Sequence, residues 1–250
     1  MTAAPASVPS PKTVFSRVRL RRDVPLQALA PVLMPAEPNA RLAVAHRLMW
    51  ALFPGSREQD RDFLWREETP GRTLGDRVTF YLLSARPPVD AHTLFEIGSK
   101  PFAPELAAGD RLAFALRVNP VVSMRAPGAR ERGKRHDPIA VRLSGLSREE
   151  RGERRDAVIQ EVARDWLAAQ GERHGFRLIE PETLRAEDAW RQVPRDKGEK
   201  SVAFSVLDLE GRLEVADPAR LVTALSAGFG KAKAFGCGLM LIRRLPAARR

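Results

Sequence analysis

Residues 217–243 read DPARLVTALSAGFGKAKAFGCGLMLIR, and this stretch indicates the fold of the C-terminal half. Asp217 followed by Pro218 is typical of a helix N-cap and the first helical position. The helix is expected to run into Gly228, where a glycine-rich loop begins. An apolar run at residues 239–243 is expected to form a strand after the loop. The stretch therefore predicts the last helix and the last strand of an α+β unit.

The loop between this helix and this strand contains four glycines and two lysines within the eleven residues 228–238. Glycines permit positive φ angles and a close approach of the backbone, so that consecutive N–H groups can surround a phosphate. The pattern matches neither a Walker A loop nor a Rossmann fingerprint. The alternative is an ordinary helix C-cap with a glycine turn. The candidate phosphate-binding residues are Gly228, Gly230, Lys231, Lys233, Gly236 and Gly238.

The other elements predicted for the C-terminal half precede this stretch. A long helix is expected at residues 153–174, and a strand at 176–179. Residues 201–208 and 212–215 are expected to pair as a hairpin around Leu209-Glu210-Gly211. Together with the closing helix and strand, these elements resemble a ferredoxin-like unit.

The N-terminal half shows a comparable order of elements. Residues 13–22 alternate in side-chain character and predict a strand, and residues 39–53 predict a helix with Asn39 as its cap. Strands are expected at 62–67, 77–84 and 111–118, whereas residues 87–104 are expected to be irregular. The order resembles a βαββαβ ferredoxin-like unit whose second helix is degenerate.

These patterns predict an α+β protein with tandem ferredoxin-like, RNA-recognition-motif-like domains. Residues 1–12 are expected to form a flexible extension, and residues 13–124 the N-terminal domain. Residues 125–138 are expected to form a basic linker, and residues 139–250 the C-terminal domain with the glycine-rich loop.

The charge of the chain points to a polyanionic partner. The 250 residues include 42 Lys and Arg against 31 Asp and Glu, which gives a net charge of +11. Nucleic acid is the first candidate and an anionic membrane surface the second. Without a membrane-spanning segment or a secretory signal at the start, the sequence predicts a cytoplasmic protein. One cysteine and four scattered histidines make a protein-built metal site improbable, so that neither a metal nor a cofactor is expected.

His46 is the main candidate for a catalytic side chain. It lies on the apolar stripe of the predicted helix at 39–53, one turn from Leu42 and Met49. A histidine there is often a core residue, but it can also serve as an acid or base near neutral pH without a metal. Arg47 follows it and is a candidate contact for RNA at the rim of the site.

A second basic segment is the loop WRQVPRDKGEK at residues 190–200. Loops with this composition follow nucleic-acid backbones. The alternative is a solvated hairpin tip, and the sequence does not decide between the two. Its candidate RNA contacts are Arg191, Arg195, Lys197 and Lys200.

Five segments in order resemble one family. They read HRLMWALFP at 46–54, RDFLW at 61–65, FALRVNP at 114–120, EGRLEV at 210–215 and the glycine-rich loop at 228–238. The chain resembles the CasE endoribonucleases of type I-E Cascade complexes from about residue 14 to residue 244. This resemblance implies tandem ferredoxin-like domains and metal-independent cleavage of precursor CRISPR RNA within its repeats. It also implies a 2′,3′-cyclic phosphate product and an enzyme that stays on the repeat hairpin as a Cascade subunit.

The resemblance assigns roles to individual residues. The family's catalytic histidine corresponds to His46, its glycine-rich loop to residues 228–238, and its stem-gripping basic loop approximately to residues 191–200. Well-known members of the family carry a tyrosine one helical turn before the histidine, where this chain has Ala43. The single tyrosine, Tyr81, is distant in sequence. Whether His46 acts as a base or an acid stays open, and a non-catalytic RNA-binding subunit is the alternative. A scaffold that binds only protein is the weaker third possibility.

Overall fold

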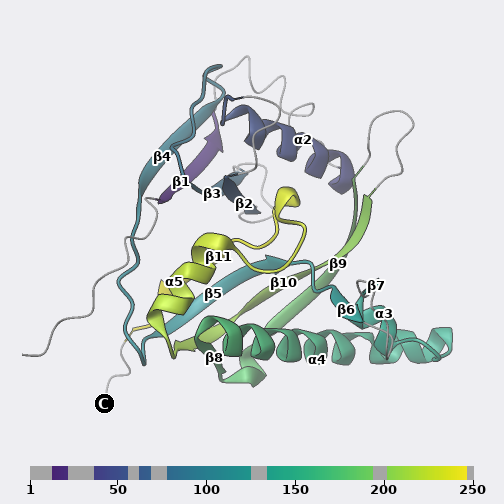
Figure 1. The fold of residues 1–250 in the computed structure, drawn as a ribbon. Coiled ribbons are helices and arrows are strands. Elements are labelled where there is room, and N and C mark those ends of the chain that lie inside the picture. Colours follow the sequence, from purple (N-terminus) through teal and green to yellow (C-terminus); the bar gives the residue numbers. More distant parts are fainter. Residues whose placement is uncertain are drawn as a thin grey trace, which may run out of the picture.

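The computed structural model describes residues 13–21, 37–55, 62–68, 78–124, 134–193 and 202–246. Within these residues the chain forms two large antiparallel sheets, one above the other in Figure 1, with helices on the outer faces of both. This arrangement confirms the predicted α+β class with tandem ferredoxin-like units. The predicted N-terminal extension at residues 1–12 lies outside the described residues.

The first sheet has the strand order of a ferredoxin-like unit. Its order is β2-β3-β1-β4, and every neighbouring pair is antiparallel. Helix α2 covers one face, where Ala45 and Met49 are buried against Phe80 and Leu82. The bounds are β1 (Thr13–Leu20), α2 (Pro38–Ala51), β2 (Phe63–Glu68), β3 (Thr79–Ser84) and β4 (Phe95–Phe102).

Helix α2 begins one residue earlier than the sequence predicts. Its N-cap is Glu37, whose carboxylate accepts hydrogen bonds from the backbone N–H groups of Asn39 and Ala40. Asn39 is therefore inside the helix and is not its cap. A carboxylate at this end also interacts favourably with the helix dipole, and these bonds lower the pKa of Glu37.

The second sheet repeats the arrangement on a larger scale. Its order is β11-β5-β10-β8, and β9 pairs with another part of β10. Helices α4 and α5 contribute buried leucines, including Leu167 and Leu221, to the core on one face. The main bounds are β5 (Arg111–Val118), α4 (Arg148–His174), β8 (Phe176–Ile179), β9 (Arg185–Val193), β10 (Val202–Val215), α5 (Pro218–Ala227) and β11 (Met240–Arg244). The short elements are β6 (Val122–Met124), β7 (Lys134–His136), α3 (Pro138–Arg142), η1 (Pro181–Thr183) and η2 (Lys233–Phe235).

Two strand assignments made from the sequence are wrong. Residues 111–118 do not close the first sheet, because β5 pairs with β10 and β11 of the second sheet. The closing strand is β4, within residues predicted to be irregular. As an edge strand, β4 is largely exposed and lacks the apolar alternation that a half-buried strand shows. The domain boundaries stay a prediction, and this pairing favours a division within residues 103–110.

The predicted hairpin around Leu209-Glu210-Gly211 is also wrong. These residues lie within the continuous strand β10, which pairs with β5 from Leu207 to Glu214. A Cβ atom on Gly211 would lie 3.1 Å from both Leu184 and Phe114. The glycine therefore provides space for these side chains and does not form a turn.

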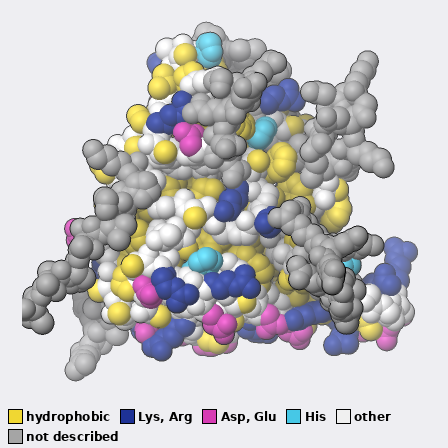
Figure 2. Space-filling view, in the orientation of Figure 1, with side chains coloured by type: hydrophobic (Ala, Val, Ile, Leu, Met, Phe, Trp, Pro, Cys, Tyr) yellow, Lys and Arg dark blue, Asp and Glu magenta, His cyan; other side chains and the backbone are white. Residues whose placement is uncertain are grey.

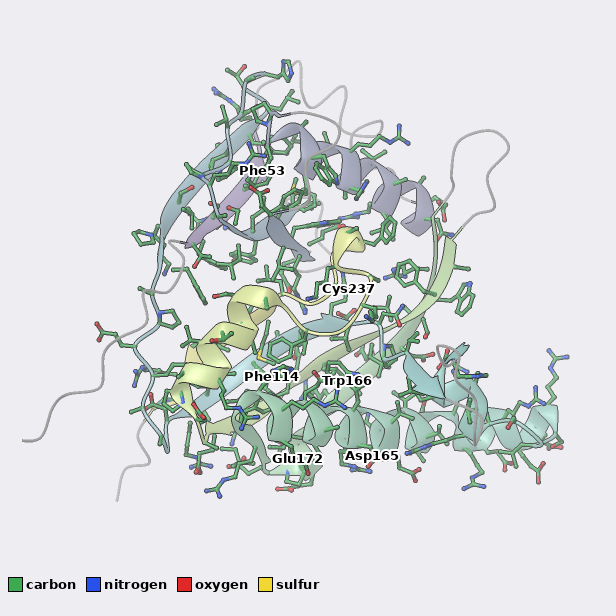
Figure 3. The ribbon with its side chains drawn as sticks, in the orientation of Figure 1. Phe53, Phe114, Asp165, Trp166, Glu172 and Cys237 are labelled. Atoms are coloured by element: carbon green, nitrogen blue, oxygen red, sulfur yellow. The ribbon has the colours of Figure 1, made fainter. Side chains whose placement is uncertain are left out.

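Helix α4 begins at Arg148, five residues before the predicted start at residue 153. The prediction began too late because the first turns of the helix are highly charged. Ser147 and Glu150 form a capping box, and Gly175 ends the helix with a φ of 76°. Figure 3 shows Trp166 on the sheet side of α4, and Asp165 and Glu172 on the side facing away from the sheet. The first turns contain mostly charged residues and therefore lack the apolar periodicity from which a helix is predicted.

A charge network and an apolar cluster join the two sheets. Leu64 and Leu83 of the first sheet are buried with Leu239, which precedes β11. Asp208 of β10 accepts two hydrogen bonds of 2.9 Å from the Arg117 guanidinium and lies 3.8 Å from Arg66 of β2. Burial acts to lower the pKa of Arg117, but the bond and charge of Asp208 outweigh it and raise that pKa. Asp208 thus connects β2 with β5.

Replacing Asp208 is expected to weaken this connection. An Asp208→Ala variant leaves the guanidinium groups of Arg117 and Arg66 without their shared carboxylate. We expect a loss of about 2–3 kcal/mol in the free energy of unfolding, between the values for exposed and buried ion pairs. Chemical denaturation measures the loss. The control is Asp165→Ala, whose ion pair with Arg142 is exposed and whose cost should stay below about 0.5 kcal/mol.

Candidate functional site around His46

The glycine-rich loop at residues 228–238 extends from α5 toward α2 and β2 before it enters β11 (Figure 1). Its four glycines, which the sequence analysis singled out, all have positive φ angles. Ala232 also has a positive φ, of 53°, and η2 follows it. The loop therefore depends on a backbone conformation that glycine adopts without strain.

Several N–H groups of the loop bond within the protein. Phe229 donates to the carbonyl of Gly238 at 2.9 Å, and Gly238 donates to the carbonyl of Arg117 at 2.7 Å. The Gly228 N–H donates to Ala224 at 2.8 Å and ends helix α5. These bonds close the base of the loop on itself and attach it to β5.

Side chains of β2 approach the glycines closely. A Cβ atom on Gly228 would lie 2.7 Å from the Leu64 side chain, and one on Gly236 would lie 3.2 Å from the Trp65 ring. On Gly238 it would lie 2.6 Å from the Phe229 carbonyl oxygen. Three of the glycines thus provide the space in which the loop packs against the first sheet and against itself.

This packing places a loop carbonyl beside His46. The carbonyl oxygen of Ala234 lies 2.8 Å from Nδ1 of His46 and accepts a hydrogen bond of 3.0 Å from Nε1 of Trp65. Because a carbonyl oxygen can only accept, the Nδ1 atom of His46 carries a proton. In the neutral ring, Nε2 is then the atom with the lone pair.

Aromatic rings fix the orientation of the half-buried imidazole. The ring of Phe235 lies 5.3 Å from that of His46, and the ring of Trp50 lies at 6.3 Å in an edge-on arrangement. His46 is therefore held by one hydrogen bond and two rings, with part of its surface accessible.

Cys237 lies within the loop but is poorly suited to be a nucleophile. It is fully buried against Ala43, Phe204 and Val206, between α2 and the second sheet (Figure 3). Burial raises the pKa of the Cys237 thiol to about 12, although the charge of Arg117 opposes this effect. At neutral pH the sulfur is a protonated thiol and has a packing role.

The candidate basic side chains occupy different positions. Arg47 and Lys231 are exposed, whereas the Lys233 ammonium donates to the carbonyl of Ala227 at 2.7 Å, at the end of α5. Arg191 lies on β9 opposite Phe204, and its charge acts on Cys237. Figure 2 shows Lys and Arg side chains in the middle of the molecular face that is turned toward the viewer. Along α4, basic and acidic side chains alternate.

Part of the predicted interface cannot be placed. Arg195, Lys197 and Lys200 lie outside the described residues, as does most of the predicted linker at 125–138. The described end of that linker forms β7, which pairs with β6.

The two residues that concern the missing tyrosine are far from each other in the fold. Ala43 is buried at the contact between α2 and β10, in the same cluster as Cys237. Tyr81 lies on the face of the first sheet opposite α2, stacked on Phe15 with ring centroids 5.6 Å apart. Tyr81 therefore does not replace the hydroxyl that the family carries near its histidine.

A search of the described residues finds no group of three or more His, Cys, Asp or Glu side chains that could hold a metal ion. Among the helices of these same residues, none has the length and hydropathy required to span a membrane.

The known proteins that this chain resembles are CRISPR proteins. The profile of the family described as CRISPR associated protein matches residues 15–244. The chain belongs to this family.

Two CRISPR relatives match most of the chain. The CRISPR-associated endoribonuclease Cse3 of Thermus thermophilus is 32% identical over 84% of this chain and 96% of its own length. The CRISPR system Cascade subunit CasE of Escherichia coli is 28% identical over 80% of this chain and 90% of its own length.

Solved structures of CRISPR proteins share the fold. Thermus thermophilus Cse3, bound to an RNA representing a pre-cleavage complex, matches with a TM-score of 0.62 and 26% identity. The match covers 93% of this chain and 99% of that one. Cas6e from Escherichia coli matches with a TM-score of 0.56 and 23% identity over 93% of this chain and its whole own length.

Sequence reasoning selected His46 and the loop of this CRISPR associated protein, but not the atoms that connect them. Trp65 lies in the segment RDFLW at 61–65, and nothing in the sequence indicates its role. The Ala234 carbonyl carries no side-chain signal at all, because any residue provides a carbonyl. Only the folded chain identifies both groups as partners of the histidine.

Replacing Gly236 is expected to disturb the loop. In Gly236→Val, a β-branched residue must adopt a φ of 77° and contact the Trp65 ring. We expect a loss of about 2–4 kcal/mol in the free energy of unfolding and weaker RNA binding. Denaturation and RNA titration measure the two effects. Gly98→Val in β4 is the control, since no atom lies within 4 Å of its Cβ position; equal stability of both variants would contradict the prediction.

Installing the missing tyrosine should not restore a family contact without a cost. An Ala43→Tyr side chain would have to enter the buried cluster of Phe204, Val206 and Cys237. We expect a destabilisation of about 1–3 kcal/mol from overpacking, measured by thermal or chemical unfolding. A variant of unchanged stability that cleaves RNA faster would show that the cluster can open for the hydroxyl.

Proposed function

We propose that this protein is a CRISPR endoribonuclease that cleaves precursor CRISPR RNA within its repeats, without a metal ion, and stays bound to the repeat hairpin. The names of its relatives support the reaction class, and the RNA-bound Cse3 structure supports RNA as the ligand. Similarity to CasE supports the assembly of this protein into a Cascade complex, and we place this complex in the cytoplasm as part of the proposal.

The observation that carries the proposal is the hydrogen bond between His46 and Ala234. It keeps the Nδ1 proton in place, so that proton transfer to or from RNA proceeds through Nε2. In the neutral ring Nε2 accepts the proton of a ribose 2′-hydroxyl, and in the charged ring it donates a proton to the departing 5′-oxygen. The 2′-oxygen attacks the adjacent phosphorus while the bond to the 5′-oxygen breaks. The products are a 2′,3′-cyclic phosphate and a 5′-hydroxyl.

Cations near the site complete the proposed chemistry. Arg47 follows His46 on α2 and is exposed, and Lys231 is exposed in the loop. These charges would attract the phosphate and stabilise the negative charge that develops on it in the transition state. The basic segment at 191–200 would hold the stem of the hairpin through phosphate contacts.

The second candidate function is RNA binding without cleavage. Ala43 favours it, because the neighbouring hydroxyl of the family is absent and Tyr81 is on the other face of the sheet. Binding and cleavage assays on the same repeat RNA distinguish the two functions.

Removing the imidazole should abolish most of the catalysis. We expect His46→Ala to slow cleavage of a repeat hairpin by about 10²- to 10⁴-fold, the contribution of a positioned acid or base. Hairpin affinity should change little, since cationic side chains carry most of the phosphate contacts. Single-turnover cleavage and a binding titration measure the two quantities.

Two controls in the same assay test the proposed reaction path, one with an altered substrate and one with a metal chelator. A 2′-deoxyribose before the cut should prevent cleavage because the nucleophile is absent, and EDTA should leave the rate unchanged. Full activity of His46→Ala would place the site elsewhere, and a requirement for Mg²⁺ would exclude the metal-independent path.

Binding should depend strongly on salt. With about four to six phosphate contacts on the stem, the slope of log affinity against log salt should be about −4 to −5. Arg191→Ala should make the slope shallower by about one unit, whereas Arg154→Ala on the exposed face of α4 should leave it unchanged. Affinities measured from about 50 to 200 mM salt provide the slopes; a slope near zero would contradict the proposed phosphate contacts.

A further inference from the structure

Trp65 of β2 is a buried hydrogen-bond donor to which the proposed cleavage chemistry gives no role. Its side chain is 1% exposed and packs in the core of the first sheet, with its ring centroid 6.1 Å from that of Phe80. The indole Nε1–H can only donate, and a buried donor without an acceptor is unfavourable. Its acceptor is the carbonyl oxygen of Ala234, at 3.0 Å. This hydrogen bond therefore reaches out of the first sheet into the glycine-rich loop.

The same oxygen holds the imidazole of His46. Nδ1 of His46 lies 2.8 Å from it, so two donors from different elements, β2 and α2, meet at one acceptor. A carbonyl oxygen has two lone pairs and can accept both bonds. Both bonds depend on the position in which the loop holds this oxygen.

Of the two donors, Trp65 has the more rigid surroundings. Its ring is enclosed by the sheet core, and the loop lies directly on it, since a Cβ atom on Gly236 would be 3.2 Å from the ring. Ala234 lies in the short turn η2, which follows Ala232 with its φ of 53°. A single turn that begins at a residue in a strained conformation does not fix the direction of a carbonyl by itself. Trp65 therefore sets the position of the oxygen, and the half-buried His46 follows it.

The position of this oxygen matters for the chemistry because it selects a tautomer of His46. As a base, His46 starts from the neutral ring with its proton on Nδ1, and as an acid it ends as that ring after Nε2 has given up its proton. Both roles thus require the same neutral tautomer. Without an acceptor at Nδ1, a neutral imidazole prefers its proton on Nε2, the atom that exchanges a proton with RNA in the proposed reaction.

We propose that Trp65 is a positioning residue for the cleavage reaction, which holds the Ala234 carbonyl in place and thereby keeps the proton of neutral His46 on Nδ1. This inference rests on the proposed function, because it concerns the same histidine and the same reaction. Trp65 is enclosed in the core and acts through the loop backbone, without contact to RNA.

The test removes the N–H group of Trp65 and keeps the shape of its ring. Site-specific replacement of Trp65 by benzothienylalanine puts a sulfur atom in the place of Nε1–H, so that the packing against Phe80 and Gly236 is retained. We expect single-turnover cleavage of a repeat hairpin to slow about five- to tenfold, the effect of one lost hydrogen bond, while hairpin affinity stays within about twofold.

A nitrogen NMR spectrum of the imidazole rings reports the tautomer directly and without RNA. In the unmodified protein, neutral His46 should show a protonated Nδ1 and an unprotonated Nε2. In the benzothienyl variant the two signals should move toward each other, because the tautomer with the proton on Nε2 becomes populated. The His46→Ala spectrum identifies which signals belong to His46. A residue that only supported the fold would leave these signals in place.

The matched control is the same replacement at Trp166 of α4, whose ring lies 3.4 Å from the Cβ position of Gly230 in the same loop (Figure 3). It should retain the cleavage rate and the signals of His46. The inference is overturned if the replacement at Trp65 leaves either the rate or these signals unchanged, or if the replacement at Trp166 has the same effects. An unmodified protein that binds the hairpin without cleaving it would contradict the proposed function instead, and the signals of His46 would still show whether Trp65 sets its tautomer.

Discussion

A single backbone carbonyl connects the two halves of this molecule at its candidate site. The oxygen of Ala234 accepts hydrogen bonds from His46 on α2 and from Trp65 on β2, and it belongs to a loop of the second sheet. Both donors come from the first sheet and its helix, so the imidazole has its orientation only when the two units are joined. The tautomer of His46 follows from this bond, because the protonated Nδ1 leaves the lone pair of the neutral ring on Nε2.

The contacts around this carbonyl depend on small residues and on one shared carboxylate. Gly228 and Gly236 allow the loop to approach Leu64 and Trp65 at distances that a Cβ atom would prevent. Asp208 holds Arg117, whose carbonyl in turn accepts the N–H of Gly238. The bond between Asp208 and Arg117 thus helps to fix β5, and β5 in turn holds the base of the glycine-rich loop. Packing and electrostatics act on the same segment.

The two faces of the first sheet pack against different parts of the molecule. On one face α2 covers the core, and His46 of this helix bonds to the Ala234 carbonyl of the glycine-rich loop. On the other face Phe15 and Tyr81 stack on each other and pack against the buried cluster of Leu64, Leu83 and Leu239, which joins the two sheets. One face therefore contributes to the candidate site, and the other face contributes to the contact between the sheets.

The sequence by itself determined the fold class, the positions of α2, α5 and β8 to within a few residues, and the choice of His46 and the glycine-rich loop. These conclusions rest on local signals, namely apolar periodicity, capping residues and glycine spacing, together with a family resemblance. It misplaced β5, missed β4 and divided β10 at Gly211, since strand pairing depends on partners far along the chain. Only the tertiary structure brought Trp65 and the Ala234 carbonyl to His46, buried Ala43, and placed Tyr81 on the opposite face. Those contacts join residues that are up to 188 positions apart in the sequence. No local sequence pattern indicates that such residues are close in space.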